Sequence, residues 1–488
     1  MEGAIYTYGV PQFRSEQQRK YVEQRVQAKL TEIHQRQRSA ELTRSQSNTT
    51  TSSGGYNDRK KLRRTSTEDS GYWYGPASLV TERDAEMETT SQQRSVGLGS
   101  ISSASTASTH SQEQAASDLL ANPFELRHGR RYLRELAYPL PCDLAEIQRQ
   151  NLRTLLGCSV FGRAVCSPKV TKSVPQKVLE VGCGSAYWSA RCHEYFTSCG
   201  HRNVSFTGLD IAPLAPDLKK QGVNWTFVQH DLRRIPWPFD DEEFDLIMLK
   251  DLSLVVPLGS ASQKLIDECI RLLRVDGTLE IWESDHILRS LLPHPPPPTS
   301  RQRAEQDVAL STSTFLVAPG TPFAPAGNKY LTHANTWITE ALDRRKFPPS
   351  PCARVAQVLY QEPESLGNVG MRRVAIPLGE LRWERDSYKH GRSKSDADDL
   401  LLGKGKGRAS EKTLTPDQAA LRQTALLTVL QMIESFEPLL KEVSGKNSEE
   451  WGHWWQSMMA DMMDPNRGAV SGECLEVGAW WATKLADS

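Results

Sequence analysis

Apolar residues are distributed unevenly along the chain. The first hundred or so residues are rich in Gln, Ser, Thr and Arg, and apolar content rises only past Leu119. A segment that cannot bury enough apolar surface to offset its ordering entropy stays disordered. We therefore expect a disordered tail over residues 1–118, with a charged, fraying helix at 15–45, and a folded part of roughly 350 residues.

Beyond the tail, short apolar runs alternate with stretches of helical periodicity. We expect strands at residues 177–181, 204–210, 225–229, 244–249, 278–283, 354–361 and 372–377. Helical stretches fall between them, the clearest at 261–273. This alternation predicts an α/β fold with a doubly wound, mostly parallel, Rossmann-like sheet. A sheet of seven strands, with the last two antiparallel, differs from the six-stranded sheet of nicotinamide-binding Rossmann domains.

A helical segment at 119–177 precedes this sheet. Asp143 and Glu146 have the spacing of a capping box, in which each side chain accepts from a backbone N–H at the start of a helix. The predicted helix runs to about Leu156. We expect its apolar side to consist of Leu144, Ile147, Leu152 and Leu155.

Three further segments are added to the predicted sheet domain at 178–388. A Pro-rich stretch at about 290–330 predicts an exposed insertion, and residues 389–414 have the composition of a linker. Residues 415–488 predict C-terminal helices, the first beginning at Thr415 and broken near Pro438. The second carries a stripe of large apolar side chains at helical spacing, which are Trp451, Trp454, Trp455, Met458, Met459, Met462 and Met463. We expect this stripe to pack on the sheet domain, although such stripes also form binding surfaces.

Composition and charge exclude several classes of protein. The chain has 59 basic and 59 acidic residues, so no overall basic excess favours nucleic acid as a partner. Nine cysteines without a CxxC pair indicate reduced, intracellular thiols. We find no signal-peptide pattern and no apolar run long enough for a membrane span. These features predict a soluble protein of the cytoplasm or nucleus, and the basic run at 59–64 is a candidate nuclear import signal.

A glycine turn follows the first predicted strand. Gly182 and Gly184 flank Cys183, and glycine there lets the backbone approach a ligand that a Cβ would exclude. The dinucleotide pattern requires a third glycine where this chain has Tyr187. Glu180, two residues before the turn, would face a pyrophosphate unfavourably but suits a cationic ligand. The turn therefore favours a positively charged cofactor over a nicotinamide dinucleotide.

Two acidic residues follow the next strands. Asp210, with Ile211 after it, ends the second strand and can accept bonds from both hydroxyls of a ribose. Asp231 follows the third strand and can accept from an adenine amino group, with Leu232 covering the ring. Alone, each acid is an ordinary turn residue. Their order after the glycine turn makes them evidence for a site that binds an adenosyl group.

The run 178–283, with these three elements in order, resembles the class I S-adenosylmethionine (SAM) dependent methyltransferases. The expected sheet of seven strands fits the fold of this family, and the resemblance implies S-adenosyl-L-methionine as cofactor. The residues implied to bind it are Glu180, Gly182, Cys183, Gly184, Asp210, Ile211, Asp231, Leu232 and Lys250.

A narrower resemblance rests on two short motifs. The run Tyr138-Pro139-Leu140-Pro141-Cys142-Asp143 with Glu146 and Arg149, and the run Ile376-Pro377-Leu378-Gly379 with Trp383, are similar to fungal methyltransferases like the secondary-metabolism regulator LaeA. This implies a fungal protein with a regulatory or biosynthetic role. The chain departs from that pattern at Ala186, in place of a third loop glycine, and in its tail, insertion and C-terminal helices.

The methyl acceptor is less apparent in the sequence. After the fourth strand the chain has Lys250 and Asp251, without the Asn/Asp-Pro-Pro-aromatic run that holds an amide or exocyclic nitrogen. Pro351-Cys352 falls too late to be the nucleophile of a cytosine-5 enzyme. By position, Asp251 and His286 are the candidate general bases, and the sequence predicts no metal site.

Three hypotheses for function remain. The chain is an active methyltransferase acting on a small metabolite or a protein, or a SAM-binding regulatory module that works through partner contacts. Protein partners would bind the N-terminal tail or the C-terminal Trp/Met helix, and no membrane is expected. A nicotinamide oxidoreductase is the third hypothesis, disfavoured by Glu180 and Tyr187.

Overall fold

The computed structural model describes residues 118–293, 302–318, 320–384, 414–464, 467–469 and 471–486. These residues fall within one compact unit. The expected tail helix at 15–45, the basic run at 59–64 and nearly all of the expected linker lie outside the described residues.

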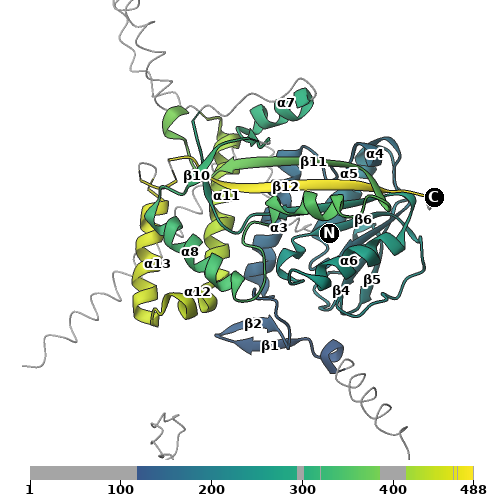
Figure 1. The fold of residues 1–488 in the computed structure, drawn as a ribbon, viewed down its shortest axis with the longest axis horizontal. Coiled ribbons are helices and arrows are strands. Elements are labelled where there is room, and N and C mark those ends of the chain that lie inside the picture. Colours follow the sequence, from purple (N-terminus) through teal and green to yellow (C-terminus); the bar gives the residue numbers. More distant parts are fainter. Residues whose placement is uncertain are drawn as a thin grey trace, which may run out of the picture. The chain divides into compact units, whose positions relative to one another are not determined.

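Five parallel strands form one side of the described sheet (Figure 1), which has ten strands instead of the seven expected. They are β3 (Lys177–Val181), β4 (Ser205–Asp210), β5 (Asn224–Gln229), β6 (Phe244–Lys250) and β7 (Leu273–Ser284). Their spatial order is β5-β4-β3-β6-β7, so the chain moves outward in one direction from β3 and then returns to its other side. This confirms the doubly wound, mostly parallel sheet and places its topological switch point between β3 and β6.

Two long antiparallel strands extend the sheet beyond β7. β12 (Glu473–Lys484) pairs with β7 on one side and with β11 (Leu366–Pro377) on the other. The C-terminal segment therefore ends in a central strand, whereas the sequence predicted helices throughout. Nearly every residue of β12 is buried, so the strand lacks the alternation of apolar and polar residues that reveals a half-exposed strand.

The prediction of a strand at residues 354–361 is wrong. This segment forms helix α9 (Val355–Tyr360), which buries Val355 and Leu359 on one side. Those residues are four positions apart, the spacing of neighbours on a helix face, and a short apolar run alone does not distinguish a helix from a strand. The strand predicted at 372–377 forms the second half of β11.

The described part of the Pro-rich insertion is more ordered than a loop. It contributes β8 (Arg289–Leu291), α7 (Arg303–Thr312), β9 (Phe315–Leu316) and β10 (Phe323–Pro325). β8 pairs with β12 and β10, and β9 pairs with β11. The insertion thus continues the sheet at its antiparallel side.

A separate hairpin and several helices complete the first part of the fold. They are the hairpin β1 (Phe124–Arg127) and β2 (Arg130–Leu133), the helices α3 (Leu144–Phe161), α4 (Pro168–Lys172), α5 (Tyr187–Ser198) and α6 (Ser260–Leu272), and the 3-10 turns η1 (Leu218–Gln221), η2 (Leu252–Leu254) and η4 (Pro351–Ala353). The segment at 119–177 therefore contains a hairpin as well as helices.

The C-terminal helices gather with α8 (Lys329–Asp343) on the side away from β4 and β5 (Figure 1). α11 (Pro416–Ser435) and α12 (Glu437–Ser444) are separated at Phe436, just before Pro438 as the sequence predicted. In α13 (Ser448–Met462), Trp451 and Trp454 are buried, and the Trp454 ring lies 4.9 Å from that of Trp337 on α8. Trp451, Trp454, Met458 and Met462 of the stripe are therefore core packing, whereas Met463 is half-exposed.

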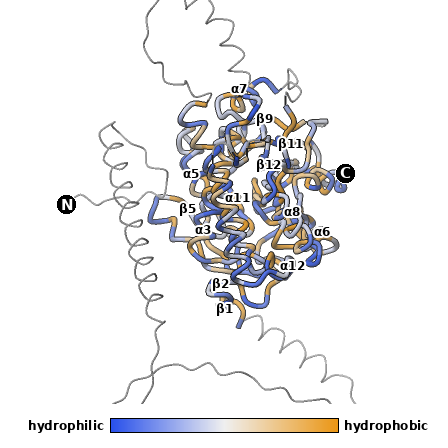
Figure 2. The backbone as a smooth tube through the Cα atoms, turned by 90° about the vertical axis from the view of Figure 1, so that its left-hand side faces the viewer, coloured by the Kyte–Doolittle hydropathy of each residue, from blue (hydrophilic) through white to orange (hydrophobic). Residues whose placement is uncertain are grey.

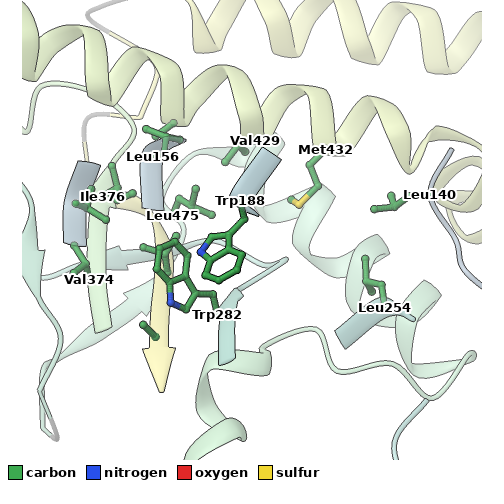
Figure 3. Packing of buried hydrophobic residues seen from close by; sticks show 14 of the residues in the cluster. Leu140, Leu156, Trp188, Leu254, Trp282, Val374, Ile376, Val429, Met432 and Leu475 are labelled. Atoms are coloured by element: carbon green, nitrogen blue, oxygen red, sulfur yellow. The ribbon is translucent and has the colours of Figure 1, made fainter. Parts of the chain in front are cut away.

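Apolar segments concentrate inside the described unit (Figure 2). The largest core cluster joins Trp188 on α5 and Trp282 on β7 to Val429 and Met432 of α11 (Figure 3). Helix α11 thus belongs to the same core as the parallel sheet. None of the described helices is long and apolar enough to span a membrane.

Candidate functional site

A cavity of about 300 Å³ lies where β3, β4 and β6 end, at the switch point of the sheet. This is the position at which doubly wound sheets bind ligands, because the loops after neighbouring strands diverge there. All of the site residues expected from the sequence line it, which are Glu180, Gly182, Cys183, Gly184, Asp210, Ile211, Asp231, Leu232, Lys250, Asp251 and His286.

The glycine turn after β3 forms the floor of the cavity. Gly182 and Gly184 have φ values of +64° and +50°, in the left-handed region that glycine adopts without strain. A Cβ on Gly182 would lie 2.5 Å from Cδ2 of Leu252, so a side chain at this position would displace Leu252. A Cβ on Gly184 would meet no atom closer than 3.8 Å, because its backbone lies against the open cavity.

Asp210 connects β4 to this turn. Its Oδ2 accepts from the Gly184 N–H at 2.8 Å and its Oδ1 from the Ala212 N–H at 2.9 Å. Burial raises the pKa of Asp210, and these backbone bonds oppose that rise. Each carboxylate oxygen keeps a further lone pair, so the group can still accept from a bound ligand.

Asp231 already has a strong partner. Its Oδ2 lies 2.7 Å from Nη2 of Arg233, and Nε of the same guanidinium donates to Oδ1 at 2.9 Å. Burial would raise the pKa of Asp231, but the bonds to Arg233 outweigh it and lower the pKa. Asp231 therefore lines the cavity as an ionised group held in place by Arg233.

The sequence suggested that Glu180 points at a ligand. In the structure its carboxylate is instead hydrogen-bonded to Ser189. Its Oε2 accepts from the hydroxyl of Ser189 at 2.6 Å and from the Ser189 N–H at 3.2 Å, in the first turns of α5. Burial raises its pKa to about 7. The acid thus fastens helix α5 to β3 beneath the glycine turn.

A wall of the cavity beside the glycine turn is formed by α3, whose Asn151 accepts from the Ser185 hydroxyl at 2.6 Å, and the buried face of this helix is polar. Leu144 is exposed, whereas Glu146, Arg149 and Arg153 are buried, so the apolar side predicted for this helix is wrong. Asp143 caps the helix as expected, but the Glu146 carboxylate binds Arg149 at 2.8 Å and Ser435 at 2.7 Å instead of reaching back to the cap. The buried charges on this face were not evident because a helix normally buries its apolar side.

Asp251 follows β6 in a left-handed backbone conformation, with φ +54°. Its carboxylate pairs with the ammonium of Lys250. Burial would raise the pKa of Asp251, but Lys250 and Arg153 lower it to about 2. A carboxylate held so firmly ionised is a weak general base.

His286 belongs to a hydrogen-bonded chain at the edge of the cavity. Ser253 donates from its hydroxyl to Oε2 of Glu283 at 2.8 Å, and the same hydroxyl lies 3.2 Å from Nε2 of His286. Burial, then the charge of Arg153, lowers the pKa of His286 to about 3, so the ring is neutral at physiological pH. Its Nδ1 is buried without a partner in the described residues.

Several residues that line or support the cavity were missed in the sequence. They are Arg153, Ser253, Glu283 and Met432. Spacing could have revealed Arg153, because Glu146, Arg149 and Arg153 recur at i, i+3 and i+7 on one helix face. Met432 comes from a helix about 280 positions later in the chain, and local spacing carries no signal for such a contact.

One cluster among the described residues has the ligand atoms for a metal ion, namely Asp285, Cys352 and Glu476. However, Glu476 is paired with both Arg289 and Arg373. A cation there would meet two guanidinium groups, so the cluster is better described as a buried ion-pair network.

Comparison with known proteins supports the interpretation of the sheet domain. Residues 178–277 match a family described as "Methyltransferase domain". This part of the chain is similar to methyltransferase domains, and it holds the glycine turn and both strand-end acids. Helix α3, His286 and helix α11 lie outside the matched residues. No curated protein matches the chain.

Solved structures of similar fold share little sequence with this chain. The MccD protein is 11% identical, over 68% of this chain and 96% of that one, with a TM-score of 0.29. The phospholethanolamine N-methyltransferase 2 of Haemonchus contortus, in complex with phosphomonomethylethanolamine and S-adenosylhomocysteine, is 12% identical over 69% and 58%, with a TM-score of 0.27. The [4+2]-cyclase SpnF is 12% identical over 72% and 99%, with a TM-score of 0.31.

Proposed function

We propose that the chain binds SAM in the cavity at the switch point and transfers its methyl group to an acceptor that enters the same cavity. The observation that carries this proposal is the convergence of the glycine turn, Asp210 and Asp231 on one cavity, within the residues that match a methyltransferase domain. Strand-end acids and an open glycine backbone suit an adenosyl group with a cationic sulfur.

The residues present fit such a cofactor. Asp210 has lone pairs left for ribose hydroxyls, and Asp231 is ionised near Leu232, whose side chain can cover an adenine ring. Glu180, Asp210 and Asp231 all line the cavity, and because Asp231 is paired with Arg233, Glu180 and Asp210 are left to interact with a cationic ligand. When bound, SAM supplies a methyl group on a positively charged sulfur that leaves readily.

The transfer itself is a displacement. A lone pair of the acceptor forms a bond to the methyl carbon, the bond from that carbon to sulfur breaks, and its electron pair stays on sulfur. The protein contributes by holding the acceptor in line and excluding water, since the methyl carbon is already activated. An acceptor that attacks through a hydroxyl, a thiol or an N–H group also loses a proton, and a positioned base is required only for that proton.

Both candidate bases have lowered pKa values, about 2 for Asp251 and about 3 for His286, so His286 is preferred on geometry alone. Asp251 is committed to Lys250, whereas Nδ1 of His286 has no partner among the described residues. The contact of Nε2 with Ser253 holds the ring in place, so that Nδ1 keeps one orientation.

Two finer proposals concern biology. The motifs around Asp143 and Ile376 support a relationship to fungal LaeA-like methyltransferases, with a role in regulating secondary metabolism or development. In the alternative to catalysis, SAM binding would regulate partner contacts made by other parts of the chain. The buried stripe on α13 leaves that helix less able to provide those contacts.

The experiment that tests catalysis is transfer of a labelled methyl group. The full chain is incubated with labelled SAM and panels of small metabolites and proteins, beside the variant Gly182→Arg, which fills the turn next to Leu252. Label transferred by the natural chain and not by the variant supports the enzyme. SAM binding without transfer to any acceptor class, together with a cellular phenotype that survives Gly182→Arg, would favour a scaffold.

A further inference from the structure

One buried arginine in the cavity lacks a charged partner. Arg153 lies on the inner face of α3 and is only 6% exposed. Among the described residues its hydrogen-bond partner is the sulfur of Met432, 3.5 Å from Nη2, and its buried Nε has none. An arginine remains charged in proteins, so this position keeps a positive charge away from both water and a carboxylate.

The other basic residues around the cavity are paired. Arg149 binds Glu146, Lys250 binds Asp251, and Arg233 binds Asp231. Among the arginines and lysines that line the cavity in the part of the chain that the structure describes, Arg153 is thus the one without an acidic hydrogen-bond partner. Its guanidinium is therefore suited to a ligand group that carries a negative charge.

Unpartnered nitrogen atoms mark the same wall. Nη1 of Arg149, Nε of Arg153 and Nδ1 of His286 are all buried without a hydrogen-bond partner in the described residues, and all three side chains line the cavity. Buried polar groups are nearly always satisfied in folded proteins. Several unsatisfied nitrogens beside one cavity indicate that a bound molecule supplies the oxygen atoms.

We propose that the methyl acceptor carries an oxyanion group, a carboxylate or a phosphate, that binds Arg153, and an apolar body that fills the rest of the cavity. The planar guanidinium offers paired N–H donors that match either group. Apolar residues also line the cavity, among them Leu140, Leu254 and Met432, the last in contact with Arg153. This inference rests on the proposed function and specifies its acceptor.

Arg153 lies closer to the acceptor end of the cavity than to the cofactor end. Arg153 and His286 both lie against helix α11, since Nη2 of Arg153 is 3.5 Å from the sulfur of Met432 and the His286 ring is 6.3 Å from that of Phe436. The glycine turn instead contacts α3 through Asn151, whose Oδ1 accepts from the Ser185 hydroxyl at 2.6 Å. The anion is thus expected beside His286 and not beside the glycine turn.

The test uses the full chain with three small probes of one shape, namely benzoate, phenyl phosphate and uncharged benzamide. Their affinities are measured by calorimetry in the presence and absence of S-adenosylhomocysteine. We expect at least one of the two anions to bind at least tenfold more tightly than benzamide. The stronger anion shows whether the site prefers a carboxylate or a phosphate.

Two variants and one control assign this preference to Arg153. Arg153→Met should abolish the preference for anions, and Arg153→Lys should retain part of it because the charge remains without the planar fork. The control Arg202→Met removes an exposed arginine far from the cavity and should change nothing. Arg153→Met should also keep or raise the melting temperature, because it removes an unpaired buried charge.

Three results would overturn the proposal. The first is equal binding, or no binding, of all three probes to the natural chain. The second is an anion preference that survives Arg153→Met. The third is that Arg153→Met binds S-adenosylhomocysteine at least tenfold more weakly but binds methylthioadenosine, which lacks the carboxylate, with unchanged affinity. In that case Arg153 would bind the carboxylate of the cofactor and not the acceptor. Absence of any S-adenosylhomocysteine binding to the natural chain would instead reject the proposed function.

Discussion

Oδ2 of Asp210 accepts a hydrogen bond of 2.8 Å from the backbone N–H of Gly184. This bond joins the end of β4 to the glycine turn after β3, so an acid and a loop that are 26 positions apart form one wall of the cavity. The same bond orients the carboxylate, because its other oxygen is held by Ala212. Cofactor binding and the shape of the turn are therefore expected to depend on each other.

Substitution of Gly182 tests the turn. Gly182→Ala adds a Cβ at φ +64° and 2.5 Å from Cδ2 of Leu252, and we expect it to lower the free energy of unfolding by about 1–3 kcal/mol. It should also weaken S-adenosylhomocysteine binding. Gly200→Ala is the matched control, since Gly200 has φ +93° but no atom within 4 Å of a Cβ. Chemical denaturation that gives equal losses for both variants would refute the steric argument.

The pH dependence of stability tests the buried Glu283. Burial and the charge of Asp251 raise the pKa of Glu283 to about 8, from an ordinary value of 4.5. The folded state then binds the proton more tightly than the unfolded state, so this contribution is complete below about pH 4.5 and is lost as the pH rises to 8.

Glu283→Gln removes this titration while keeping a polar side chain of similar size. From pH 5 to pH 8, the stability of the variant relative to the natural chain should rise by on the order of 1–3 kcal/mol. Glu364→Gln, at an exposed position, is the control and should show no such trend. A difference that stays constant over this range, measured by urea unfolding, would mean that Glu283 is ionised throughout.

His286 is expected to affect transfer without affecting cofactor binding. With an acceptor found by labelled methyl transfer that must lose a proton, His286→Gln should lower kcat by about 10²-fold or more. Binding of S-adenosylhomocysteine should change less than twofold. His201→Gln, on an exposed loop, serves as control. An unchanged kcat would show that the proton leaves to water or that none is lost.

Strand β12 is expected to be essential for the fold. Trp480 lies on this strand and is fully buried, so Trp480→Ala should cost about 3–5 kcal/mol of stability. Trp480→Phe should cost much less, because it keeps the ring and removes an Nε1–H that has no partner in the described residues. Met463→Ala changes a half-exposed side chain and should have an effect within about 0.5 kcal/mol. Equal losses for Trp480→Ala and Met463→Ala would contradict the central position of β12.

The parallel half of the fold and the location of the site could be predicted from the sequence. Glu180, Asp210 and Lys250 each lie near the end of a short apolar strand, and parallel strands end at the same edge of a sheet. That geometry brings together residues far apart in the sequence without any knowledge of side-chain packing. The partners of these acids could not be predicted, since the bonds of Glu180 to Ser189 depend on how α5 docks.

The antiparallel half and the acceptor wall could not be predicted. β12 lies after three helices, and its near-complete burial removes the alternation that identifies a strand. Arg153 lies on a helix whose buried side was expected to be apolar. Only the position of α11, set by long-range packing of Val429 and Met432, makes that polar side an inner wall.

Calorimetric titration of the full chain with S-adenosylhomocysteine and with NAD tests the central claim most directly. We predict one S-adenosylhomocysteine per chain with a dissociation constant below about 100 µM, and no binding of NAD. Asp210→Ala should weaken binding at least about tenfold, and the exposed control Asp240→Ala should not change it. No binding to the natural chain, or equal binding by Asp210→Ala, would contradict the account.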